Sequence, residues 1–176
     1  MSRRDTTTFP STPDLCDEFE DTIRIVDPSL GFRNYGGKTR FGGQVVTVKC
    51  FEDNSVMKEL IVAKTAIQST GKVVMVVDGG GSRRRALLGD QLALECVNRG
   101  WEGLVIYGSI RDVDEIGALN LGVQALGPAP MKTVKRNEGQ SSISISFGGV
   151  TFKDGDYIVC DNNGIVVHDR DMSRRL

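Results

Sequence analysis

The stretch that decides the fold begins with Val76-Val77-Asp78-Gly79-Gly80-Gly81 and ends with Arg111-Asp112-Val113-Asp114-Glu115. Between these segments lie a helical run over residues 91–99 and a strand over residues 103–107. Two strands are thus each followed by a polar turn, and the turns lead to Asp90 and to Arg111-Asp112. Adjacent parallel strands of a βαβ unit end at the same edge of the sheet. We therefore expect the two turns to converge there, and we predict that the functional residues lie at that edge.

Composition indicates one globular domain. The 176 residues are 39% hydrophobic and 26% charged, which suits a single domain spanning residues 1–176 with a sizeable core. The formal net charge of −1 argues against direct binding of nucleic acid, because such surfaces carry a basic excess. The absence of an apolar run of roughly 18 residues argues against a membrane span.

The four cysteines indicate a reducing compartment. Cys16, Cys50, Cys96 and Cys160 are far apart and have neither C-x-x-C nor zinc spacing, so we expect free thiols. Residues 1–13 are polar and lack the apolar core of a secretory signal. We therefore predict a cytoplasmic protein.

The first half of the chain has helical and strand patterns in alternation. Residues 13–19 and 55–67 are predicted helices, the second capped by Asn54, and residues 44–50 and 72–78 are predicted strands. Residues 72–78 are nearly all apolar, which is typical of a central strand covered on both faces. We expect residues 1–11 and 170–176 to be flexible because they are polar terminal segments.

In the second half of the chain the helical periodicity gives way to the alternating pattern of short strands. A strand is predicted at residues 123–126, and residues 127–140 read as a loop. Alternating residues follow at 142–147, and the turn Asn163-Gly164 is a strong hairpin signal. The fold class is therefore α/β: a βαβ-type layered sheet with helices in the first half and short antiparallel strands in the second.

Two glycine-rich segments approach phosphate-binding motifs without matching them. Residues 31–39 end in Gly-Lys-Thr, but they have one glycine too many for a P-loop and precede a strand, where a helix is needed. Residues 79–81 follow a strand but lack the G-x-G-x-x-G spacing. We interpret residues 31–39 as a loop with basic side chains and residues 79–81 as a packing turn, and cofactor binding at residues 79–81 stays open as an alternative.

Gly89-Asp90-Gln91-Leu92 precedes an apolar periodic run and is typical of a helix N-terminus. Free amides and the positive end of the helix dipole at such a site suit a carboxylate or phosphate. The alternative is that Asp90 serves only as the N-cap of the helix.

Arg111-Asp112 follows the next strand. Arg111 offers a planar fork for a carboxylate or keto oxygen, and Asp112 offers a hard oxygen ligand for Mg²⁺ or Mn²⁺. The alternative is a surface pair of little energetic value. The chain's one histidine, His168, has no serine or cysteine partner that would indicate nucleophilic catalysis.

Four segments together resemble the RraA family: residues 41–54, 77–82, 100–108 and 147–150. The resemblance covers residues 14–167. It implies an RraA-like, swivelling-domain-like α/β/α sandwich and a homotrimer.

The resemblance implies two kinds of activity. Family members are either inhibitors of the endoribonuclease RNase E or metal-dependent 4-hydroxy-4-methyl-2-oxoglutarate aldolases that also decarboxylate oxaloacetate. Catalytic members carry an aspartate, twenty residues and then Arg-Asp. Here Asp90 is followed by twenty residues and then Arg111-Asp112.

The resemblance also implies a role for each matched position. The amides of Gly89, Asp90, Gln91 and Leu92 would bind the substrate carboxylate, and Arg111 would contact its keto oxygen. Asp112 would bind the divalent metal cation (Mg²⁺ or Mn²⁺), and Asp90 would position a water that moves protons. Family aldolases also receive an acidic residue from a neighbouring subunit, to which no position here is assigned.

The sequence thus favours a class II (metal-dependent) carbon–carbon lyase on small 2-oxo acids. Oxaloacetate and 4-hydroxy-4-methyl-2-oxoglutarate are the expected substrates, cleaved through a pyruvate enolate to pyruvate. The alternative is a protein-binding regulator of an RNase E-type ribonuclease with no essential catalysis.

Overall fold

A mixed β-sheet is the centre of the structure. The computed structural model describes residues 9–63 and 71–173, and ten strands within these ranges form one sheet. The elements of the first half are α1 (Thr12–Glu18), β1 (Arg24–Ile25), the 3₁₀ helix η1 (Pro28–Leu30), β2 (Arg33–Asn34), β3 (Phe41–Lys49), α2 (Ser55–Ala63), β4 (Val73–Asp78), β5 (Ala86–Leu88) and α3 (Asp90–Asn98). Those of the second half are β6 (Gly103–Ile110), α4 (Val113–Gly117), β7 (Gly122–Pro128), β8 (Gln140–Ser141), β9 (Ile145–Phe147), β10 (Val150–Phe152), β11 (Tyr157–Asp161) and β12 (Gly164–His168).

The middle of the sheet is parallel and its ends are antiparallel. The strand order is β1-β12-β11-β3-β4-β6-β7-β2, with β5 beside β6 and β8 beside β3. β3, β4, β6 and β7 run parallel, whereas β11, β12, β1 and β2 are antiparallel to their neighbours. All six residues of β4 are buried, as its continuous apolar sequence predicts for a central strand.

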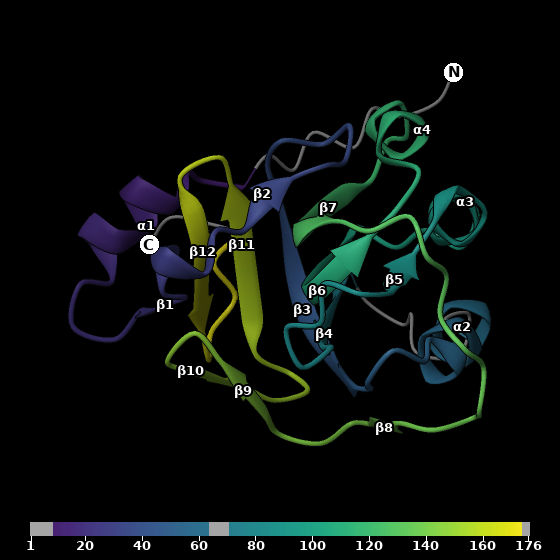
Figure 1. Cartoon of the computed structure of the whole chain (residues 1–176). Helices are drawn as coiled ribbons and strands as arrows, with labels where there is room; N and C mark the ends of the chain where they lie inside the picture. Colours follow the sequence, from purple (N-terminus) through teal and green to yellow (C-terminus); the bar gives the residue numbers. More distant parts are fainter. Residues whose placement is uncertain (1–8, 64–70, 174–176) are drawn as a thin grey trace.

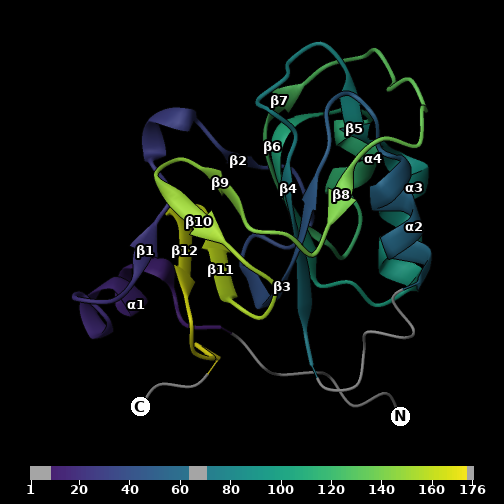
Figure 2. The same ribbon diagram turned by 90° about the horizontal axis from the view of Figure 1, so that it is seen from below.

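Different elements cover the two faces of the sheet. In Figure 1, α2, α3 and α4 lie together on one side, and α1 lies at the other end beside β12. The helix-side core includes Met57, Ile61 and Cys96 against Met75 and Ile106 of the strands. The β9–β10 hairpin forms a separate two-stranded piece outside the helix layer (Figure 2). Its buried residues share one core with residues of β3, β4 and β6 on the face opposite the helices.

The predicted α/β class is confirmed, with helices in the first half and antiparallel strands in the second. The third layer differs from the expected α/β/α sandwich, because the β9–β10 hairpin covers the face where helices were expected. The alternating residues Ile145, Phe147, Val150 and Phe152 explain this: they present one apolar side to the sheet.

Several predicted boundaries need correction. The predicted start of α2 at Ser55 is confirmed, and Asn54 O accepts from Lys58 N (3.0 Å). The side-chain bond at the helix start, however, comes from Asp53, which accepts from Ser55 N (2.8 Å). β5 was not predicted at all, because its three residues are too few for a periodic pattern. The predicted end of α2, residues 64–67, lies outside the described residues.

The predicted flexible ends are also only partly described. Residues 1–8 and 174–176 lie outside the described part of the chain. Within it, Phe9 and Met172 are buried together against Leu15 of α1 and Val159 and Val166 of the sheet. Flexibility is therefore wrong for these two residues, whose apolar side chains complete a small core.

All four cysteines are free thiols, as predicted, and three of them are buried. Burial raises the pKa of the Cys50 thiol to about 12, with nearby Asp53 and Asp78 acting in the same direction. Among the described residues, no helix is both long and apolar enough to cross a membrane.

The ring of Phe41 packs directly against the backbone of two neighbouring strands, at positions where both have glycine. The fully buried Phe41 ring lies over Gly103 and Gly122, and a Cβ added at either glycine would overlap it. The ring thus fills the space above β6 and β7 that side chains at positions 103 and 122 would otherwise occupy.

We predict that Gly122→Ala lowers the free energy of unfolding by about 1–3 kcal/mol, because the added methyl overpacks the Phe41 ring. Urea unfolding followed by circular dichroism measures the change, and Phe41→Leu in the same chain should recover part of it. Gly164→Ala is the matched control, since a Cβ there meets no atom within 4 Å. Equal stability of Gly122→Ala and the natural chain would contradict this packing.

Candidate active site

The two polar turns converge, and two hydrogen bonds join them. Arg111 N donates to Leu88 O (2.9 Å), and Asp90 N donates to the Asp112 carboxylate oxygen Oδ2 (3.1 Å). The short strand β5, which pairs with the end of β6, brings the first turn to this position. The predicted meeting of the turns at one sheet edge is confirmed.

An open cleft lies at this edge. Its volume is about 660 Å³, and it contains five of the six predicted site residues. The lining residues are Asn54, Arg85, Ala86, Gly89, Asp90, Gln91, Leu92, Arg111, Met131, Lys132, Thr133, Val134 and Lys135. Asp112, the sixth predicted residue, is outside this lining and lies directly behind Gly89.

The start of α3 forms one wall of the cleft. Gly89 is the N-cap in extended conformation and supplies no side-chain bond, and Asp90 is the first helical residue. The alternative reading of Asp90 as the N-cap is therefore wrong. The Asp90 side chain accepts from Gln91 N (2.8 Å), while Asp112 accepts from Asp90 N. Two amides of the helix start thus already hold carboxylates, which is the class of ligand predicted for this site.

Asp112 has an unusual backbone conformation. Its φ of 55° and ψ of 45° lie in the left-handed region, which costs energy for a residue other than glycine, although aspartate tolerates it better than most. It is the N-cap of α4 but makes no side-chain cap bond there. The carboxylate instead accepts from Asp90 N at the start of α3, so Asp112 links the starts of two helices. Its role is therefore not limited to a surface ion pair with Arg111.

Gly89 leaves the room that this arrangement needs. A Cβ on Gly89 would come within 2.8 Å of Asp112 Oδ2 and within 3.3 Å of Arg111 Nε. Arg111 Nε lies 3.6 Å from Asp112 Oδ2, and the two side chains are 40% and 34% exposed. Both can therefore reach solvent and a ligand.

The carboxylate oxygens available at this site suit a cation that keeps most of its water ligands better than one fully coordinated by protein side chains. No cluster of three or more His, Cys, Asp or Glu side chains that could hold a metal occurs in the described ranges. Asp112 Oδ2 is engaged by an amide, and within the same ranges Oδ1 has no hydrogen bond. One carboxylate oxygen can hold a Mg²⁺ ion that keeps most of its waters.

Charge in the cleft favours an anionic ligand. Four of the lining side chains are basic, namely Arg85, Arg111, Lys132 and Lys135, and Asp90 is the one acid among the described lining residues. Arg85 also donates to Lys132 O (2.8 Å), so its guanidinium is held at the cleft wall. The positive end of the α3 dipole adds to this potential.

Two residues that sequence reasoning missed hold the opposite wall in place. Asn54 donates through Nδ2 to Leu87 O (2.9 Å) and accepts from the Thr133 hydroxyl (3.1 Å). Asp53 accepts from the amides of Arg136 (2.6 Å) and Glu138 (3.2 Å). The sequence indicates Asn54 only as a helix cap, and no local pattern shows that Asp53 and Asn54 bind a loop 79–83 residues away.

The glycine-rich segments have packing roles. The amides of Gly79 and Gly81 both donate to Tyr107 O, which closes that turn onto β6. A Cβ on Gly36 or Gly37 would overlap the backbone carbonyls of Leu121 and Leu119. Neither segment lines the cleft, in line with the interpretation of residues 79–81 as a packing turn and of residues 31–39 as a loop.

Comparison with known proteins identifies the class. Residues 12–167 match the RraA-like family, described as Aldolase/RraA, and the chain belongs to this family. A Pseudomonas fluorescens protein provisionally named 4-hydroxy-4-methyl-2-oxoglutarate aldolase is 56% identical over 89% of this chain and 91% of its own length. A Hahella chejuensis protein with the same provisional name is 55% identical over 92% of this chain and 94% of its own.

Solved structures agree on the fold and carry different names. The RNA-processing inhibitor RraA from Thermus thermophilis is 31% identical with a TM-score of 0.81, covering 92% of this chain and 93% of that one. A Geobacillus kaustophilus protein named S-adenosylmethionine: 2-dimethylmenaquinone methyltransferase is 41% identical with a TM-score of 0.86, covering 95% and 99%. The expected family membership is thus confirmed.

We predict that Asp53→Asn lowers the free energy of unfolding by about 1.5–3 kcal/mol at neutral pH, since it removes the charge from a buried carboxylate that accepts bonds from three backbone amides. Burial alone raises the pKa of Asp53, but the bonds from Ser55, Arg136 and Glu138 outweigh it and lower the pKa from 3.8 to about 2. Because the folded-state pKa is the lower one, the stabilisation is present above about pH 4 and is lost as the pH falls toward 2.

Urea unfolding at pH 7 and pH 3 tests this expectation: the difference between Asp53→Asn and the natural chain should narrow at the lower pH. Asp114→Asn is the control, because Asp114 is exposed and should give no difference at either pH. A difference independent of pH would show that the Asp53 charge is not what holds the loop.

Proposed function

We propose that this protein is a divalent-metal-dependent carbon–carbon lyase acting on small 2-oxo acids. The substrates are 4-hydroxy-4-methyl-2-oxoglutarate, oxaloacetate or both. One observation carries the proposal: Arg111 and the start of α3 line one basic cleft, and the bond from Asp90 N to Asp112 fixes them relative to each other. The provisional names of the Pseudomonas and Hahella relatives support the aldolase part of the proposal.

The substrate is held at two points in this proposal. Its carboxylate binds at the amide end of α3 through the N–H groups of Gly89 and Leu92, because those of Asp90 and Gln91 already donate to the Asp112 and Asp90 carboxylates. The Arg111 guanidinium lies next to that helix start and donates to the 2-keto oxygen. With the carboxylate and the adjacent keto group both held, the bond between carbons 3 and 4 projects from a fixed point in the cleft.

Asp112 is the residue that would hold the cation. When bound, Mg²⁺ or Mn²⁺ supplies Lewis-acid polarisation of the keto oxygen. The Asp112 carboxylate stays oriented because Asp90 N donates to it, and Gly89 leaves it space.

The same bond breaks in both substrates. In oxaloacetate the bond between carbons 3 and 4 breaks, carbon dioxide leaves, and the electron pair moves toward the keto oxygen to give pyruvate enolate. In 4-hydroxy-4-methyl-2-oxoglutarate that bond breaks with loss of the hydroxyl proton, so a second pyruvate leaves. Protonation of the enolate at carbon 3 completes both reactions, and Asp90 at the cleft wall positions the water that carries these protons.

We predict that the protein releases pyruvate from oxaloacetate, measured with a coupled lactate dehydrogenase assay, and that EDTA abolishes the release. Arg111→Ala should lower kcat/KM by about 100-fold or more, because one donor to the developing oxyanion is lost. Asp112→Asn should abolish metal-dependent activity while keeping a residue type that tolerates left-handed backbone.

Asp114→Ala serves as the matched control, because Asp114 is an exposed acid two residues away and should leave the rate unchanged. Pyruvate release that survives EDTA, or that is unaffected in Asp112→Asn, would rule out the mechanism. The complete lack of pyruvate release from either substrate would favour another activity, including the methyl transfer named for the Geobacillus relative.

A second function is favoured by the likeness to the Thermus RNA-processing inhibitor, at 31% identity. In this proposal a homotrimer binds an RNase E-type ribonuclease through its outer surface and lowers RNA cleavage. Co-purification with RNase E and inhibition of cleavage of a short RNA are the expected results. Asp112→Asn should inhibit as well as the natural chain, and the lack of binding at micromolar concentrations would count against this function.

A further inference from the structure

The proposed lyase function leaves part of the positive charge in the cleft without a role. It uses the start of α3 and Arg111 to hold the first carboxylate and the keto oxygen of the substrate. Three further basic side chains line the same cleft, namely Arg85, Lys132 and Lys135. None of these three forms an ion pair with another described residue. Their charge is therefore available to a second anionic group of a ligand.

Arg85 is the most firmly held of the three side chains. It is half-buried, and its Nη1 donates to Lys132 O (2.8 Å). A guanidinium has five N–H donors, so one edge with two donors remains for a carboxylate. Glu52 is close enough to interact with Arg85, but its carboxylate already accepts two hydrogen bonds from Arg84 (2.7 and 3.0 Å).

The backbone places Lys132 next to Arg85. Lys132 forms a parallel bridge with Ala86, and Ala86 N donates to Met131 O (2.7 Å). The exposed side chain of Lys132 therefore starts beside the arginine, and Lys135 follows on the same loop. Two positive charges thus lie together at this wall of the cleft, and a third lies close to them in sequence.

The short strand β5 sets the distance between this wall and the start of α3. Arg85 directly precedes β5 and Gly89 directly follows it, so their backbones are at most about 13 Å apart at a rise of about 3.3 Å per residue. The two carboxylate carbons of 4-hydroxy-4-methyl-2-oxoglutarate are about 5 Å apart when its chain is extended, because each carbon–carbon bond is about 1.5 Å long. The Arg85 side chain and the hydrogen bonds at both ends can span the difference.

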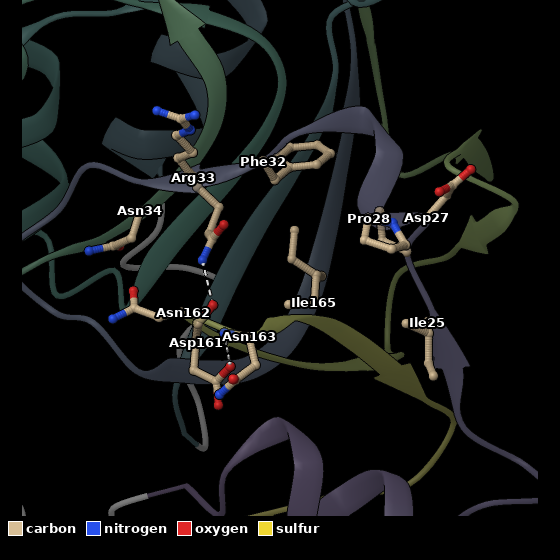
Figure 3. A pocket seen from close by; sticks show the side chains of 13 residues that line it. Ile25, Asp27, Pro28, Phe32, Arg33, Asn34, Asp161, Asn162, Asn163 and Ile165 are labelled. Atoms are coloured by element: carbon tan, nitrogen blue, oxygen red, sulfur yellow. Dashed lines mark hydrogen bonds between the residues drawn. The ribbon is translucent and has the colours of Figure 1, made fainter.

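An excess of basic side chains is not common to every hollow of the molecule. Another cavity, of about 440 Å³, lies between the β1–β2 segment and the β11–β12 turn (Figure 3). Its charged lining residues are Arg33, Asp27 and Asp161, so acids outnumber bases there. The cleft at the start of α3 has four bases and one acid among its described lining residues.

We propose that Arg85, assisted by Lys132, binds the distal carboxylate of the substrate and so favours aldol cleavage over decarboxylation. The inference rests on the proposed function, because it concerns the other end of the same 2-oxo acid. Arginine binds a carboxylate through two parallel hydrogen bonds, which fix the position of the bound group as well as its charge.

The two reactions treat the distal carboxylate differently. In aldol cleavage the carboxylate at carbon 5 passes unchanged into the second pyruvate, so a cation beside it stabilises the ground state and the transition state alike. In oxaloacetate the carboxylate at carbon 4 leaves as neutral carbon dioxide, and the electron pair of the broken bond stays with the enolate. A cation beside that carboxylate stabilises the charge that is lost, and therefore gives this reaction no assistance.

The binding of two acids that cannot be cleaved tests the subsite apart from catalysis. 2-Oxoglutarate has the distal carboxylate, and 2-oxopentanoate has a methyl group in its place. Isothermal titration calorimetry in the presence of Mg²⁺ should show that the natural chain binds 2-oxoglutarate at least about tenfold more tightly. Arg85→Gln should remove most of this preference, and Lys132→Gln, at an exposed position, should remove part of it.

Arg83→Gln is the matched control, because it removes the same charge two residues away. Arg83 lies outside the cleft lining, where its Nη1 donates to Leu126 O (3.1 Å), so the preference should stay as in the natural chain. Equal binding of the two acids by the natural chain would overturn the inference. A preference that both Arg85→Gln and Lys132→Gln retain would also overturn it, as would the lack of binding of either acid.

Steady-state kinetics test the selectivity itself. Arg85→Gln should raise KM for 4-hydroxy-4-methyl-2-oxoglutarate about tenfold with little change in kcat, and kcat for oxaloacetate should stay the same or rise. An equal fall in kcat for both substrates would overturn the selectivity.

Failure of the proposed function gives a different result, since the natural chain then releases no pyruvate from either substrate even if it prefers 2-oxoglutarate. Pyruvate release together with equal binding of the two acids would overturn only the role of Arg85 and Lys132.

Discussion

The bond from Asp90 N to the Asp112 carboxylate is the interaction on which the site depends. It joins the start of α3 to the start of α4, two helices that follow different strands of the sheet. A parallel sheet brings such turns to one edge, but it does not fix their side chains relative to each other. The charge-assisted hydrogen bond fixes them. It also explains why Asp112 has a left-handed backbone and why position 89 is a glycine, since a Cβ there would meet the Asp112 carboxylate.

Strand periodicity and the βαβ rule were enough to predict that the two polar turns meet at one sheet edge. The apolar strand β4, the following turn and the Arg111-Asp112 pair led to the edge at which the structure has a cleft. The exact start of α3 could not be predicted, because Gly89 and Asp90 both fit a helix N-terminus in sequence. The structure distinguishes them, since only the extended backbone of Gly89 occupies the N-cap position.

Long-range polar contacts were beyond sequence reasoning. Asp53 and Asn54 hold the loop that forms the far wall of the cleft, yet in sequence they look like ordinary residues before a helix. The same holds for β5, whose three residues pair with the end of β6 only because the turn around residues 79–81 directs the chain there. The hairpin layer was missed for a related reason: alternation predicts strands, but it does not say which surface their apolar side covers.

The shortness of the outermost strands has a consequence for how copies of the chain can meet. β1 and β2, at the two ends of the main strand order, are each two residues long. An exposed strand this short offers too few unpaired peptide groups to template another chain. Growth of the sheet from one molecule into the next is therefore disfavoured, which protects a β-rich protein from fibrous aggregation and leaves loops and helix faces as the surfaces for any ordered assembly.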